Sequence, residues 1–166
     1  MAYNIDFTKK ADIILHIRKF LLYPNHWEDT TKHIPTNLKW KQVKFSNTNK
    51  AKIPNNIGLY CFVVKPLYKN FIDTNYLFYV GQTQNSLSVR YGNYLDEQAG
   101  KGKPRSKIFE MLNLYRKYIY FYYTEVPTKA MVDDYEKKLI NTFVPHINTS
   151  IPEAKINHEL KYIYEH

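Results

Sequence analysis

Two strand-like segments of this 166-residue chain decide its fold: IGLYCFVVK at 57–65 and NYLFYVG at 75–81. The first is a continuous apolar run from Ile57 to Val64, with apolar side chains on both of the faces that alternate along a strand. This pattern is typical of a strand in the middle of a sheet. The two segments can pair with each other, which would place Tyr60 of the first strand near Tyr79 of the second.

Further elements follow on the C-terminal side of these strands. The patterns predict a helix from Asn85 or Ser86 to about 95, a helix at 108–117, a strand at 118–124, and a helix from 127–128 to about 143, where Pro145 stops it. The order β-β-α-α-β-α predicts an α/β (α+β) fold, with a small, mostly antiparallel, three-stranded sheet flanked by helices.

The first 56 residues have a different sequence pattern from this core. Apolar residues at Ile13, Ile14 and Ile17 have helical spacing within 6–22, and 24–56 is polar and loop-rich with one short strand candidate at 40–45. We therefore divide the chain into a helical N-terminal extension at 1–56 that could contact DNA, a core at 57–150 and a weakly helical tail at 151–166.

Composition limits the functional class. Apolar residues make up 44% of the chain, which excludes wholesale disorder, and no apolar run approaches the roughly 18 residues of a membrane span. The N-terminus lacks the apolar stretch of a signal peptide, and Cys61 is the single cysteine, so a reducing, cytoplasmic setting is expected.

The chain is also basic, with 24 Lys and Arg against 15 Asp and Glu and a net charge of +9. A basic surface attracts polyanions, and nucleic acid is the first of these. The alternative is compositional bias, because lysine far outnumbers arginine and Asn, Ile and Tyr are abundant, as in proteins of AT-rich genomes.

Several polar residues occupy positions that packing alone does not explain. Gly58 and Gly81 lie in strands, where glycine is unfavourable unless another group approaches the backbone closely. Arg90 shares a helix face with apolar neighbours and therefore needs an anion. Glu136 lies on the apolar face of its helix, and either a divalent cation or an ion pair with Arg90 would compensate its burial.

Two further features carry weaker signals. Asn148 follows the last helix, where asparagine most often caps or turns the chain. The loop at 100–107 carries four basic residues, which suit either contact with phosphates or plain solvation: Lys101, Lys103, Arg105 and Lys107.

In order along the chain, these residues resemble the GIY-YIG nuclease family. The matching pieces are Gly58-Leu59-Tyr60, Tyr79-Val80-Gly81, the helix LSVR at 87–90 with Tyr94 beyond it, Glu136 within DYEKKLI at 134–140, and FVPHIN at 143–148. The resemblance covers about 57–150. The sequence departs from the family in the 18 residues between Tyr60 and Tyr79, which exceed the usual short hairpin and predict an extended turn.

The resemblance implies hydrolysis of a phosphodiester bond, leaving 5′-phosphate and 3′-hydroxyl ends. Glu136 would hold a single divalent cation, Mg²⁺ or Mn²⁺, against the scissile phosphate, and Arg90 would contact the same phosphate. Tyr60 would accept or relay a proton from the attacking water, while Tyr79 orients the water or the phosphate.

The remaining matched positions would support this chemistry. Tyr94 would share the proton transfer, Asn148 would brace the site, and Gly58 and Gly81 would let the backbones come close. DNA is the expected substrate, although the sequence does not separate DNA from RNA.

The sequence allows three interpretations of the function. The first is a metal-dependent DNA endonuclease, restriction-like and dimeric if it cuts both strands of a palindromic site. The second is a catalytically weak nucleic-acid-binding module of the same fold. The third is an unrelated small α/β protein in which Arg90 and Glu136 form a structural ion pair.

Overall fold

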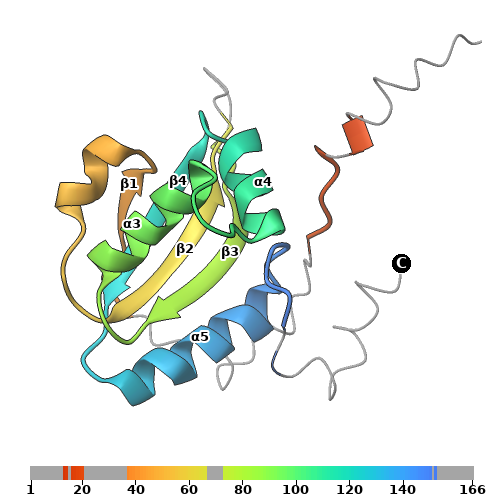
Figure 1. Ribbon diagram of the computed structural model, residues 1–166. Helices are drawn as coiled ribbons and strands as arrows, with labels where there is room; N and C mark the ends of the chain where they lie inside the picture. The colour runs from red at the N-terminus through yellow and green to blue at the C-terminus, as the bar shows by residue number, and fades with distance from the viewer. Residues whose placement is uncertain (1–12, 15, 21–36, 67–72, 151, 153–166) are drawn as a thin grey trace, which may run out of the picture.

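The computed structural model of the chain describes residues 13–14, 16–20, 37–66, 73–150 and 152 (Figure 1). The elements are strand β1 (Lys41–Lys44), the 3-10 helix η1 (Asn47–Lys52), strands β2 (Gly58–Val64) and β3 (Tyr76–Thr83), helices α3 (Leu87–Gln98) and α4 (Ser106–Leu114), strand β4 (Ile119–Glu125) and helix α5 (Lys129–Phe143). From β2 onward, this is the predicted order β-β-α-α-β-α.

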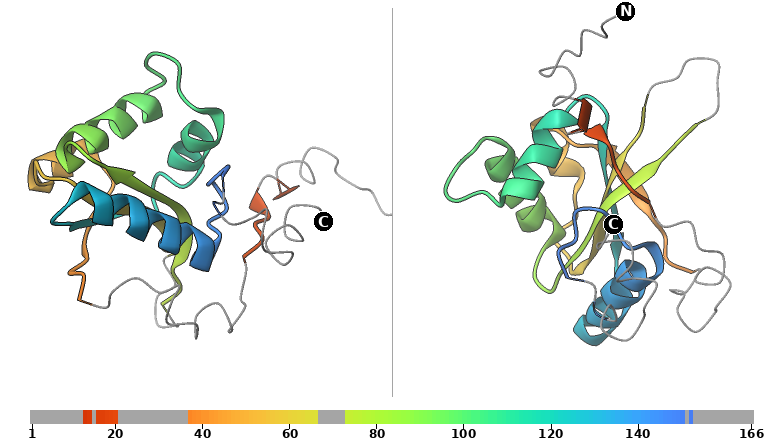
Figure 2. Two further views of the ribbon diagram at one scale, coloured as in Figure 1. Left: turned by 90° about the horizontal axis from the view of Figure 1, so that it is seen from below. Right: turned by 90° about the vertical axis from the view of Figure 1, so that its right-hand side faces the viewer.

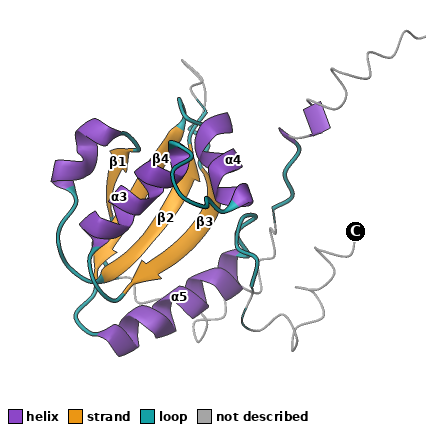
Figure 3. Ribbon diagram, viewed as in Figure 1, coloured by secondary structure: helices purple, strands orange, loops and turns teal. Residues whose placement is uncertain are grey.

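The strands form one antiparallel sheet in the order β1-β4-β2-β3 (Figure 3). As its apolar run predicted, β2 lies inside the sheet, and every residue of the strand is buried. In the pairing of β2 with β3, Phe62 opposes Tyr79 and Tyr60 opposes Gly81, with one irregularity at Phe62/Val63.

The sheet has four strands rather than the three that we predicted. The fourth is β1, the short strand candidate at 40–45, which pairs with β4 and aligns Val43 with Phe121. Phe45 and Ile53, on either side of η1, are buried in the same core cluster as Tyr60. The sheet and its core therefore begin before residue 57, within the segment expected to be an extension.

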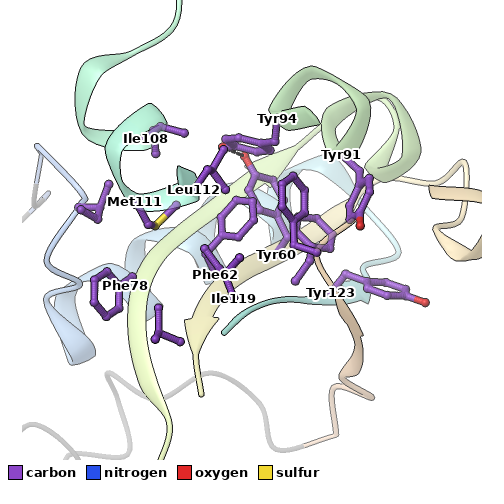
Figure 4. Close-up of a cluster of buried hydrophobic side chains, with 14 of the residues drawn as sticks. Tyr60, Phe62, Phe78, Tyr91, Tyr94, Ile108, Met111, Leu112, Ile119 and Tyr123 are labelled. Atoms are coloured by element: carbon purple, nitrogen blue, oxygen red, sulfur yellow. Dashed lines mark hydrogen bonds between the residues drawn. The ribbon is translucent and has the colours of Figure 1, made fainter. Parts of the chain in front are cut away.

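Helices cover both faces of the sheet (Figures 1 and 2). On one face, α3 and α4 pack on Phe62 and Phe121 to form a core rich in aromatic side chains, drawn in Figure 4. On the other face, α5 packs Val132 and Leu139 onto the apolar side chains of β2. Strand β3 forms one edge of the sheet. Residues from the helices on the two faces can therefore come together around this edge.

Local signals explain where the helices begin and end. The Ser86 hydroxyl accepts a hydrogen bond from the Val89 amide at the start of α3, and the Thr128 hydroxyl does the same for Met131 at the start of α5. Helix α5 ends at Phe143, and the next residue, Val144, takes up a left-handed conformation (φ 43°) just before Pro145.

The N-terminal helix predicted at 6–22 falls mostly outside the described residues. Residues 13, 14 and 16 are helical, whereas 17–20 are not. The side chains of Ile13, Ile14 and Ile17 are each more than half exposed. In the described part, the apolar spacing therefore does not correspond to a helix face packed on the core.

Apart from residue 152, the predicted tail also lies outside the described residues. None of the described helices could cross a membrane.

Candidate active site

Three predicted residues meet in a hydrogen-bonded centre between β2 and α3. The hydroxyl of Tyr60 lies 2.9 Å from that of Tyr94, and Nε of Arg90 donates to the Tyr60 oxygen at 2.8 Å. The guanidinium carbon of Arg90 lies 5.1 Å from the centre of the Tyr94 ring. Arg90 and Tyr94 are one helical turn apart on α3, which explains why both reach the same strand residue.

Tyr79 extends this centre toward the edge of the sheet. Its ring centroid lies 6.4 Å from that of Tyr60 and 6.3 Å from that of Tyr94. Whereas Tyr60 and Tyr94 are fully buried (Figure 4), Tyr79 is only partly buried and lines an open cleft. The three phenols therefore lead from the core to the surface at β3.

Burial makes these buried phenols weak acids. It raises the pKa of Tyr60 to about 12, with a further contribution from Tyr79, and the opposing effect of Arg90 is smaller. Burial also raises the pKa of Tyr94 well above its usual value. A phenol in this state is protonated at neutral pH, so its oxygen accepts the hydrogen bond of Arg90 without carrying a charge.

Gly81 and Gly58 lie where a side chain would collide with the site or the sheet. A Cβ atom at Gly81 would fall 2.5 Å from the Tyr60 hydroxyl oxygen, and its next two contacts are also atoms of that ring. A Cβ atom at Gly58 would fall 2.1 Å from the carbonyl oxygen of Thr124. Gly81 therefore makes room for the Tyr60 ring, and Gly58 allows β2 and β4 to pair.

Glu136 approaches from α5, on the other face of the sheet, and meets the cleft at the β3 edge. Together with Tyr79 and Asn148 it lines a cavity of about 670 Å³. Burial, and then the negative charge of Asp133, raise the pKa of the Glu136 carboxyl to about 7, against the opposing effects of Arg90 and Lys137. The carboxyl is therefore only partly ionised at neutral pH.

The sequence left two ways in which the burial of Glu136 could be compensated, a divalent cation or an ion pair with Arg90. The structure distinguishes between them. Among the described residues, the ion pairs within 4 Å do not include one between Arg90 and Glu136. Arg90 bonds to Tyr60 instead. The reading in which these two residues form a structural ion pair is therefore wrong.

The residues around Glu136 fit a weakly held divalent cation. The neighbouring carboxylate, Asp133, accepts hydrogen bonds from the amides of Gln82 and Gln84, so Glu136 is the carboxylate left facing the cleft. The described part of the chain holds no cluster of three or more His, Cys, Asp or Glu residues placed to bind a metal. A cation at Glu136 would thus keep several waters as ligands, as Mg²⁺ commonly does.

Asn148 closes the exposed edge of β3. Its side-chain oxygen accepts from the Val80 amide and its side-chain nitrogen donates to the Val80 carbonyl, each at 2.9 Å. The backbone amide of Ile147 donates to the carbonyl of Phe78 in the same way. The segment after α5 therefore satisfies the edge of the strand that carries Tyr79.

We expect Asn148→Ala to lower the free energy of unfolding by about 2 kcal/mol, because two buried backbone groups of Val80 lose their partners. Urea unfolding followed by circular dichroism measures the change. The exposed neighbour Thr149 provides the control, since Thr149→Ala should alter stability by less than about 0.5 kcal/mol. Equal stabilities for the two variants would mean that the hydrogen bonds between Asn148 and Val80 do not stabilise the fold.

The four basic residues of the predicted DNA-binding loop have different surroundings. Lys101 is exposed and pairs with Asp96 at 3.0 Å, and Lys103 is exposed. Lys107 is exposed and lines the same cleft as Glu136. Arg105 folds back onto α3, where it contacts Tyr94.

Sequence reasoning missed two residues beside this site. Asp133 raises the pKa of Glu136, and its position one helical turn before Glu136 could have revealed it. Glu97 binds Arg105 in the last turn of α3, where a carboxylate opposes the helix dipole. That unfavourable placement is the signal that the sequence offered.

Comparison with known families identifies this arrangement. Residues 58–149, more than half of the chain, match the GIY-YIG catalytic domain. The protein belongs to the GIY-YIG family, which is a family of nucleases, and nucleic acid is therefore the substrate class that its membership implies. No curated protein and no solved structure matches the chain.

Proposed function

We propose that the protein is a divalent-metal-dependent endonuclease that hydrolyses DNA phosphodiester bonds. The observation that carries the proposal is the convergence of Tyr60, Tyr79, Arg90 and Glu136 around the edge of β3. Arg90 hydrogen-bonds Tyr60, and Tyr79 and Glu136 line the same cleft. Arg90 links the two pairs, because its charge acts to lower the pKa of Glu136. A merely structural role would not require a half-buried carboxylate to face an open cleft.

The side chains divide the work as follows. Arg90, held through Nε by Tyr60, contacts the scissile phosphate and offsets the charge that develops there. Tyr79 lines the cleft and orients the attacking water or the phosphate. Glu136 holds Mg²⁺ or Mn²⁺, which supplies charge neutralisation at the phosphate when bound.

Water adds to phosphorus and the bond from phosphorus to the 3′ oxygen breaks, which leaves 5′-phosphate and 3′-hydroxyl ends. The leaving 3′ oxygen takes a proton from solvent water. The proton of the attacking water passes to the Tyr60–Tyr94 pair in its singly deprotonated, phenolate form, in which the two oxygens share a hydrogen bond. Because burial raises the pKa of Tyr60 to about 12, this acceptance depends on added positive charge in the site, and cutting should accelerate as the pH rises.

The biological role belongs to the same proposal. We favour a restriction-like enzyme that acts as a homodimer in the cytoplasm. The exposed residues Lys101, Lys103 and Lys107 would contact the DNA backbone near the cleft. In the described part of the chain, the buried thiol of Cys61 is unpaired, which suits a reducing compartment.

Nicking of supercoiled plasmid tests the proposed function. Wild type with Mg²⁺ should convert the plasmid to open-circle or linear forms, and EDTA should abolish cutting. Glu136→Ala should leave the plasmid intact. Equal cutting by both proteins would show that the activity lies elsewhere, while DNA binding without cutting by either would favour the binding-module alternative. Sequencing of the cut ends would reveal the recognition site.

A further inference from the structure

Arg105 and Glu97 form an ion pair beside the Tyr94 ring. Oε1 of Glu97 accepts from Nη2 of Arg105 at 2.8 Å and from Nε at 3.2 Å. The guanidinium carbon of Arg105 lies 5.3 Å from the centre of the Tyr94 ring, and that of Arg90 lies 5.1 Å from the same centre. Two guanidinium groups therefore share one phenol ring.

The two guanidinium groups lie close enough for their positive charges to repel each other. Burial, and the repulsion of Arg105 beside it, act to lower the pKa of Arg90, although the phenols of Tyr60 and Tyr94 raise it overall. Glu97 offsets only one of the two cations. A further negative group, such as a phosphate, would relieve the repulsion between the two arginines.

The position of Glu97 is unfavourable for the stability of the fold. It lies in the last turn of α3, where the helix dipole disfavours a carboxylate. Its Oε2 atom is buried and is without a hydrogen-bond partner in the described part of the chain. The Glu97 side chain is 18% exposed, against 44% for Arg105, so the carboxylate is the more buried partner of the pair. A group chosen for stability alone would avoid both penalties.

The position of Arg105 also suits a nucleic-acid ligand. Arg105 lines the cleft that contains Tyr79 and Glu136, on the side where α4 begins. A nucleic-acid strand carries one phosphate per nucleotide, so a strand that places one phosphate at Arg90 also brings its neighbour into this region. Glu97 occupies Nε and Nη2 of Arg105, which leaves Nη1 uncommitted to Glu97.

We propose that Arg105 is a second phosphate-binding arginine of this site, and that Glu97 is the positioning residue that holds its guanidinium over Tyr94. The inference rests on the proposed nuclease function. In this arrangement, Arg90 contacts the scissile phosphate and Arg105 contacts the same phosphate or its neighbour through Nη1. Arg105 thereby differs from the lysines of its loop in that a carboxylate and an aromatic ring hold its guanidinium in place.

Kinetics of plasmid nicking test the role of Arg105. Arg105→Ala should lower kcat/KM by about 10- to 100-fold, because a charge-assisted contact to the phosphate is lost. Arg105→Lys should recover only part of this loss, since lysine cannot make the forked contact. Arg116→Ala is the matched control, because it removes an exposed arginine outside the cleft. If Arg105→Ala and Arg116→Ala differ by less than twofold, the inference is overturned.

The role of Glu97 has its own signature. Glu97→Gln should lower kcat about tenfold with little change in KM, while the melting temperature stays the same or rises, because an unfavourable charge has been removed. A purely structural Glu97 would give the opposite pattern, with a lower melting temperature and an unchanged kcat, and that pattern would overturn the positioning role.

A binding measurement separates this inference from the proposed function. In a Glu136→Gln background, binding of a short DNA duplex is followed as a function of salt. Arg105→Ala should reduce the slope of log K against log salt by about 0.9, the value for one phosphate contact. If wild type never cuts, the endonuclease proposal fails and this slope still decides the role of Arg105. An unchanged slope, or no duplex binding at all, overturns the inference.

Discussion

Glu136→Gln should reduce metal-dependent nicking by at least about 1,000-fold, because glutamine cannot supply the charge that holds a divalent cation at the phosphate. The same substitution should make the metal-free protein more stable at pH 8. Burial raises the pKa of Glu136 in the folded chain to about 7, above the value of 4.5 for a free carboxyl. Loss of cutting together with a gain of stability is the result expected if Glu136 is a half-buried metal ligand.

The sign of the pH dependence follows from the direction of that shift. Because the folded pKa is the higher one, the contribution of Glu136 to stability is fully present below about pH 4.5 and is lost as the pH rises through about 7. After allowance for partial exposure of the carboxyl, we expect a penalty on the order of 1 kcal/mol at pH 8.

Thermal melts with EDTA present measure this effect. The difference in melting temperature between Glu136→Gln and wild type should widen from pH 5 to pH 8. The exposed acid Asp134, two residues earlier on α5, supplies the control through Asp134→Asn. A Glu136→Gln variant that is less stable than wild type at pH 8, or that still cuts, would argue against the assignment.

Gly81→Ala should abolish cutting although it adds a single methyl group. The new Cβ atom would lie within 2.7 Å of three atoms of Tyr60, including its hydroxyl oxygen, so the ring must shift and its hydrogen bond with Arg90 is disturbed. Displacing this hydrogen-bonded pair should cost about 100-fold or more in kcat. Overpacking should also lower the free energy of unfolding by about 1–3 kcal/mol.

Two other glycines make this prediction specific. Gly58→Ala would press on the backbone of β4 rather than on the Tyr60 ring, so it should weaken the fold itself. Gly92→Ala meets only the flexible end of Lys50, in the middle of α3, and should stabilise the protein by roughly 0.5–1 kcal/mol. Nicking and urea unfolding measured on all three variants test the series. An active Gly81→Ala protein would mean that the Tyr60 ring is free to shift without consequence.

The parts of the fold that were predictable are those with strong local patterns. The apolar run of β2 required a strand buried on both faces, and the caps Ser86 and Thr128 mark the starts of α3 and α5. Strand β1 is harder to predict as part of the sheet. It is four residues long, three of them exposed, and its stability comes from pairing with β4, a distant segment.

The site was predictable as a set of residues but not as a set of contacts. Spacing alone allowed Arg90 to face Glu136, and only the folded chain shows that it donates to Tyr60. Arg105 looked like any base in a glycine-rich loop, because its partners Glu97 and Tyr94 lie in the preceding helix. Such tertiary contacts leave no periodic trace in the sequence.

The hydrogen bonds between Asn148 and Val80 also have a consequence for where the chain can be truncated. In a protein that stopped at the end of α5, the amide and carbonyl of Val80 and the carbonyl of Phe78 would lose their partners at the edge of β3. Strands from other molecules bind to such unpaired groups. We therefore expect a chain shortened to the end of α5 to associate through β3 more readily than the longer chain.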